Sequence, residues 1–108
     1  MRRVYLYTGD LFKPLDLPWE ELEELREDPR RLLDTLRPHI EELLDCSVRE
    51  LKLFKAMTAG GETVVEYLAA LEGPAVSGEA SVKLIHSPNP VEALRKYYEW
   101  EKQTTGGE

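Results

Sequence analysis

The chain opens with a short run of β-prone residues. Residues 2–8, Arg-Arg-Val-Tyr-Leu-Tyr-Thr, are rich in aromatic and β-branched side chains, which predicts a strand. The dipeptide Gly9-Asp10 is typical of a turn and should end that strand. Residues 11–17, which include Pro14, are expected to form a loop.

A leucine stripe with helical spacing dominates residues 20–45. A helix start is predicted from Asp16 as its cap, Pro18 as an early proline, and the acidic first turn of Glu20 and Glu21. Asp28-Pro29 predicts the cap and first turn of another helix, and Pro38 removes an internal hydrogen bond. We therefore expect two or three helical segments, or one kinked helix, whose apolar stripe packs against a sheet. The stripe consists of Leu22, Leu25, Leu32, Leu33, Leu36, Ile40, Leu43 and Leu44.

Residues 48–72 are compatible with two interpretations. The segments 47–50 and 63–66 match the capping-box pattern, which would indicate two further helices. The alternative is a β-hairpin about Gly60-Gly61, in which opposite charges and aromatic side chains fall opposite one another. Because this register satisfies several constraints at once, the hairpin is favoured. Its predicted pairs are Lys55 with Glu66, Phe54 with Tyr67, Leu53 with Leu68, and Arg49 with Glu72.

The last third of the chain predicts one more strand and one more helix. Residues 80–86 are β-prone, and the segment 89–92, Asn-Pro-Val-Glu, supplies a cap, a first-turn proline and a capping acid. Val91, Leu94 and Tyr98 should form the apolar face of that helix. The resulting order β-α-α-β-β-β-α predicts an α+β fold, a small and mostly antiparallel sheet with its helices packed on one face. Residues 1–103 are expected to form one domain and residues 104–108 a frayed tail.

The net charge changes what this fold is expected to do. The 108 residues include 21 acidic and 14 basic side chains, for a formal charge of −7. The stretch from Glu20 to Asp45 holds ten acids and four bases, a formal charge of −6. An acidic helix repels phosphate, which argues against nucleic-acid binding and favours a basic protein partner. The alternative is that these acids only complement the helix dipole and keep the protein soluble.

Few residues have the spacing of a reactive or ligand-binding site. Cys46 is the only cysteine, so an intramolecular disulfide is excluded and a cytoplasmic location is expected. His39, Glu42 and Cys46 are too far apart along a helix to share one ion easily, and no glycine-rich phosphate motif occurs, so neither a metal nor a cofactor is predicted. No apolar run is long enough to span a membrane. The scarcity of Asn and Gln favours a thermophilic source.

Two functional hypotheses remain. The leading one is a non-enzymatic interaction module, such as an inhibitor, dedicated chaperone or accessory subunit, which binds a basic partner through an acidic helix and an aromatic C-terminal helix. Its predicted contact residues are Glu20, Glu21, Glu23, Glu24, Glu27, Tyr97 and Trp100. The alternative is a small enzyme or ligand-binding domain, with a site near His86, Arg95 and Tyr97. Self-association as a homo-oligomer is compatible with both hypotheses.

Overall fold

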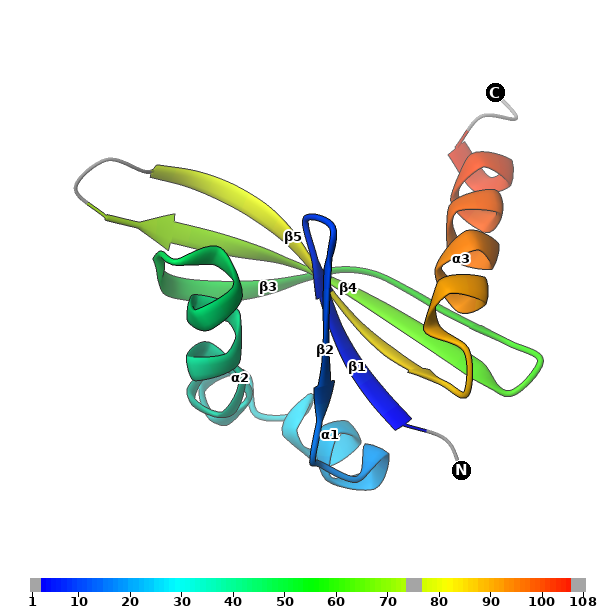
Figure 1. The fold of residues 1–108 in the computed structure, drawn as a ribbon, viewed down its shortest axis with the longest axis horizontal. Helices are drawn as coiled ribbons and strands as arrows, with labels where there is room; N and C mark the ends of the chain where they lie inside the picture. Colours follow the sequence, from blue (N-terminus) through cyan, green and yellow to red (C-terminus); the bar gives the residue numbers. More distant parts are fainter. Residues whose placement is uncertain (1–2, 74–76, 106–108) are drawn as a thin grey trace.

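The computed structural model describes residues 3–73 and 77–105 and contains one five-stranded antiparallel sheet with three helices (Figure 1). The strands lie in the order β2-β1-β5-β4-β3, so β2 and β3 are the edge strands. The predicted α+β class with a small antiparallel sheet is confirmed. The elements are β1 (Arg3–Thr8), β2 (Leu11–Leu15), α1 (Trp19–Leu25), α2 (Pro29–Leu44), β3 (Ser47–Ala59), β4 (Glu62–Glu72), β5 (Ser77–Ser87) and α3 (Pro90–Thr105).

The N-terminal segment forms a hairpin rather than a strand and a loop. The turn at Gly9-Asp10 is confirmed, and Gly9 adopts a φ of +61°, which a glycine accommodates without steric cost. The prediction of a loop over residues 11–17 is wrong, because Leu11–Leu15 pairs with β1. Pro14 is tolerated there because β2 is an edge strand, where a residue without an N–H group does not interrupt a ladder on both sides.

The hairpin about Gly60-Gly61 is confirmed, and the two additional helices of the alternative interpretation do not form. Lys55 lies opposite Glu66 as predicted. Farther from the turn the predicted register is wrong, because β3 bulges between Leu53 and Lys55 and again between Val48 and Glu50. The observed partners are Leu53 with Tyr67, Lys52 with Leu68, and Ser47 with Glu72, which replace the pairs predicted for Phe54, Leu53 and Arg49.

The helices begin close to the predicted positions. The Asp28 side chain caps α2 by accepting a hydrogen bond from the Arg31 N–H at 3.3 Å, and α2 continues through Pro38 without a break. The predicted cap at Asp16 is wrong, because Pro18 occupies the N-cap position of α1 without a side-chain hydrogen bond. The predicted cap of α3 is confirmed by a 3.2 Å hydrogen bond from the Glu92 N–H to the Asn89 side chain. This helix extends to Thr105, into the expected tail, while residues 106–108 lie outside the described residues.

The helices cover both faces of the sheet, whereas the sequence predicted one face. Helices α1 and α2 pack on one side and α3 on the other (Figure 1). Strand β4 shows why: its neighbours Val64 and Val65 point to opposite faces, yet both are completely buried. The core under α1 and α2 includes Leu6, Leu22, Leu36, Ile40, Val65 and Leu84, and the smaller core under α3 includes Met57, Val64, Ile85, Ala93, Leu94 and Tyr97.

Candidate functional site

Helix α1 presents a concentrated acidic surface. Trp19, Leu22 and Leu25 are buried against the sheet, because their i, i+3, i+6 spacing places them on one side of the helix. The residues between them therefore point outward. Within the part of the chain that the structure describes, none of the exposed acids of this segment takes part in an ion pair. We define the acidic face as the carboxylates of Glu20, Glu21, Glu23, Glu24 and Glu27. Glu27 lies just beyond the end of the helix.

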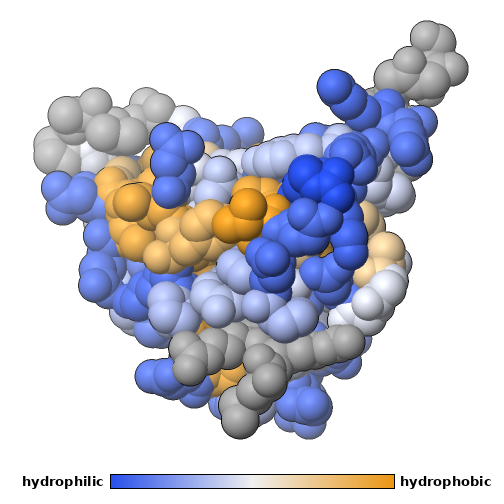
Figure 2. Space-filling model, turned by 45° about the vertical axis from the view of Figure 1, so that its right-hand side comes forward, coloured by the Kyte–Doolittle hydropathy of each residue, from blue (hydrophilic) through white to orange (hydrophobic). Residues whose placement is uncertain are grey.

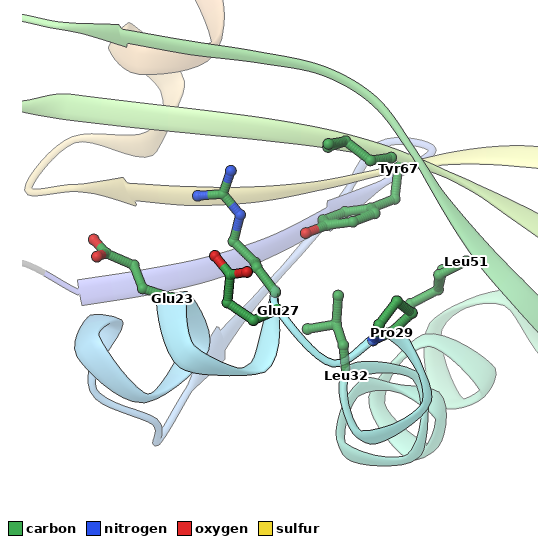
Figure 3. A pocket seen from close by; sticks show the side chains of 8 residues that line it. Glu23, Glu27, Pro29, Leu32, Leu51 and Tyr67 are labelled. Carbon is green, nitrogen blue, oxygen red and sulfur yellow. The ribbon is translucent and has the colours of Figure 1, made fainter.

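A hollow of about 410 Å³ lies next to the acidic face, between the junction of α1 with α2 and the strands β3 and β4 (Figure 3). Glu23 and Glu27 form one side of the hollow, and the apolar residues Leu32 and Leu51 form the other. The Tyr67 hydroxyl points toward the side of Glu27. The hollow thus combines an apolar wall with two carboxylates, one guanidinium from Arg26 and one phenol.

Arg26 and Tyr67 determine the charge of this hollow. Burial raises the pKa of the Tyr67 phenol, and the adjacent Arg26 guanidinium only partly offsets this shift. Tyr67 is therefore neutral near pH 7 and contributes a hydroxyl dipole rather than a charge. With two carboxylates and one guanidinium, the lining has a formal charge of −1.

The apolar wall of the hollow is accessible from outside. Leu53 lines it from strand β3 and remains 55% exposed, because β3 is an edge strand and no further strand lies beside it among the described residues. An exposed leucine next to carboxylates offers a partner both apolar and electrostatic contact. Sequence reasoning found the acids but missed this wall, because the predicted register assigned Leu53 to the wrong neighbour.

The aromatic residues of α3 are arranged differently from the prediction. Tyr97 was expected to contribute to a contact surface but is 0% exposed, and Tyr98, assigned to the core, is 44% exposed. Trp100 is partly buried and packs 5.6 Å from Tyr97, centroid to centroid. The helix buries Ala93, Leu94 and Tyr97, and of the predicted apolar face only Leu94 is buried, because Val91 and Tyr98 are exposed.

The surface on the α3 side is mixed rather than uniformly polar. Figure 2, in which this side is turned forward, shows a band of hydrophobic residues next to strongly hydrophilic ones. One contributor to the apolar surface of this face is Phe12, which pairs with Tyr7 in the sheet, packs 4.6 Å from its ring and is 36% exposed.

A buried polar network joins α3 to the sheet. Glu66 accepts hydrogen bonds from the Tyr97 hydroxyl and, at 2.8 Å, from the Ser81 hydroxyl. The Lys83 ammonium donates to Ser81 at 2.9 Å and lies 3.9 Å from the Glu66 carboxylate. Burial and the hydrogen bond to Glu66 raise the pKa of Tyr97, so its hydroxyl remains protonated as the donor. Sequence reasoning missed the network, although a charged residue in the middle of each apolar strand is a usable signal.

A second buried carboxylate supports the same helix. Glu62 accepts hydrogen bonds from the Ser87 hydroxyl and from the Lys96 ammonium. Both donors stabilise the charged form and lower the pKa of Glu62, the hydrogen bond from Lys96 most strongly. The carboxylates of Glu62 and Glu66 on β4 thus both connect to α3, one through Lys96 and one through Tyr97.

The residues of the alternative catalytic site do not come together. His86 alternates with Ile85 and Ser87 on β5 and therefore lies on the α1 face, where its ring stacks on Trp19 at 4.9 Å. Tyr97 is buried on the opposite face, and Arg95 is exposed on α3, where it pairs with Glu92 and Glu99. The sheet separates His86 from the other two, so these three residues do not form one site.

Comparison of the chain with protein-family models, curated proteins and solved structures gave no match. Among the described residues, no helix has the length and apolar character needed to cross a membrane. Within the same residues, no three His, Cys, Asp or Glu side chains come close enough to hold a metal ion. The charge and shape of the surface are therefore the features that bear on function.

Proposed function

We propose that this protein is an interaction module that binds a basic surface of a partner protein through the acidic face of α1. The observation that carries the proposal is that the five carboxylates are exposed and, among the described residues, unpaired. Several acids elsewhere lie next to bases: Glu92 and Glu99 flank Arg95, and Glu101 pairs with Lys55. The absence of paired bases on α1 leaves its field available to a cationic partner.

The local structure supports this role because the acids have a rigid base. Trp19, Leu22 and Leu25 anchor α1 in the core, so the helix that carries the carboxylates is positioned before a partner binds. Like charges three and four residues apart on a helix repel one another by a few tenths of a kcal/mol per pair. A cationic surface would relieve that repulsion, and the gain would be largest at low ionic strength.

The aromatic helix α3 contributes less to the proposed contact surface than the sequence predicts. Tyr97 is buried and bound to Glu66, so it is not available to a partner while α3 is docked. Trp100 is partly exposed on the opposite side of the sheet from the acidic face. The proposed contact surface is therefore centred on α1.

Charge reversal with a matched control tests the proposal. The fourfold variant Glu20→Lys, Glu21→Lys, Glu23→Lys and Glu24→Lys should abolish salt-sensitive capture of the partner from the native host, identified by mass spectrometry. A control with the same charge change at Asp10, Glu50, Glu72 and Glu79, all exposed and away from α1, should retain most of the capture. Partner affinity that is unchanged in the α1 variant, or reduced equally in both, would refute the proposal.

A further inference from the structure

The hollow next to α1 has the properties of a receptor for one particular side-chain type. We infer that it accepts a lysine or arginine side chain from the basic partner, an assignment that rests on the proposed function and makes it specific. The acidic face alone would attract any cation, whereas the hollow adds an apolar wall and a defined shape. A long cationic side chain is the amino-acid group that carries both an apolar stem and a positive head.

The two walls match the two parts of such a side chain. The methylene stem packs on Leu32, Leu51 and Leu53, which come from α2 and β3. The cationic head reaches the carboxylates of Glu23 and Glu27 on the opposite wall. Figure 3 shows these two carboxylates across the hollow from Leu32 and Leu51. Because the lining carries a formal charge of −1, one inserted cation makes the site neutral.

Arg26 does not turn the hollow into an anion site. Its guanidinium lies beside the Tyr67 hydroxyl, Glu27 follows it in the sequence, and the carboxylates of the lining outnumber it. An anionic ligand would also be repelled by the neighbouring carboxylates of the acidic face. A volume of about 410 Å³ accommodates one long side chain together with part of the backbone that carries it, and exposed Leu53 leaves the approach over the edge strand open.

The first experiment is a titration followed by NMR at about 20 mM ionic strength. The probe is an acetylated and amidated octapeptide, Gly-Ser-Lys-Ala-Lys-Ala-Ser-Gly, compared with versions in which both lysines are arginine, N-acetyllysine or glutamate. The lysine and arginine peptides should shift the methyl signals of Leu32, Leu51 and Leu53, and the acetylated and acidic peptides should not. Binding of the glutamate peptide, or shifts that avoid these three leucines, would overturn the inference.

Paired variants separate the hollow from the general field of the helix. Glu23→Gln with Glu27→Gln should raise the Kd for the lysine peptide about fivefold, whereas Glu20→Gln with Glu24→Gln, the same charge change outside the hollow, should raise it less than about twofold. Leu53→Ser should weaken binding about threefold, and Leu11→Ser, equally exposed on the other edge strand, should not.

The outcomes distinguish failure of the inference from failure of the proposed function. Equal losses in the two glutamine pairs, with no effect of Leu53→Ser, would leave an acidic binding face but overturn the assignment to the hollow. Unchanged affinity in every variant would overturn both. Because Leu53, Glu20, Glu23, Glu24 and Glu27 are exposed, none of these substitutions is expected to prevent folding.

Discussion

The two faces of the sheet use acidic residues in opposite ways. The acids of the acidic face on α1 lie outside an apolar core and, in the described part of the chain, have no basic partners. On the α3 face Glu62 and Glu66 are buried, and each is bound by hydroxyl and ammonium groups. Burial makes a charge structural because its partners cannot be replaced by water, whereas an exposed charge costs little and remains available for binding.

The largest expected effect comes from removing the buried carboxylate of Glu66. Glu66→Ala should lower the free energy of unfolding by about 3–5 kcal/mol, because it leaves the buried Lys83 ammonium without its counter-charge. The matched substitution Glu23→Ala on the α1 face should change it by less than about 0.5 kcal/mol. Urea unfolding monitored by circular dichroism measures both. Similar losses for the two variants would abolish the contrast between the faces.

The next effect concerns the hydroxyl of Tyr97. Tyr97→Phe keeps the ring in the core under α3 but removes one of the hydrogen bonds to Glu66, so unfolding should become easier by about 1–3 kcal/mol. Tyr98→Phe, the same change on an exposed neighbour, should cost less than about 1 kcal/mol. Thermal denaturation of the two variants measures this difference. Equal losses of stability would mean that removing any tyrosine hydroxyl has this effect, and not the hydrogen bond to Glu66 in particular.

The difference between the faces also explains how far the sequence could predict the fold. The apolar stripe of α1 and α2 has one sheet-facing side and no buried charge, so periodicity alone placed Leu22, Leu36 and Ile40 correctly. On the α3 face the same reasoning failed, because Tyr97 is held in the core by a hydrogen bond as well as by its ring. Hydrophobic periodicity does not record buried polar partners.

The strands show a second reason why the sequence could not predict the whole structure. The pair Lys55 and Glu66 was predictable from the turn at Gly60-Gly61, but each bulge in β3 inserts an unpaired residue that composition does not reveal. The hollow depends on the corrected register, which brings Leu53 opposite Tyr67. The acids of the candidate site were therefore predictable from sequence, whereas its apolar wall was not.

A smaller expected effect is the pH dependence provided by Glu62. Its pKa is lower in the folded protein than in the unfolded chain, so it stabilises the fold above the unfolded value of about 4.3. That stabilisation is lost as the pH falls through the folded pKa. Glu62→Gln should therefore flatten the decline of the urea midpoint between about pH 5 and pH 3 relative to the unsubstituted protein. Parallel curves for the two proteins would contradict this assignment.

The smallest expected effect concerns single carboxylates of the acidic face. The position of a carboxylate along α1 determines whether its removal lowers or raises the melting temperature. Glu20 is in the first turn, where the helix dipole favours a negative charge, and Glu24 is near the last residue, Leu25, in a turn that contains no basic residue. Glu20→Gln should lower the melting temperature and Glu24→Gln should raise it, each by about 1–3 °C, corresponding to a few tenths of a kcal/mol. Repeating the scans in 1 M NaCl should reduce both shifts, because salt screens exposed charges. Shifts of the same sign, or shifts that persist in high salt, would mean that these carboxylates make fixed contacts, which would remove the difference between this face and the network under α3.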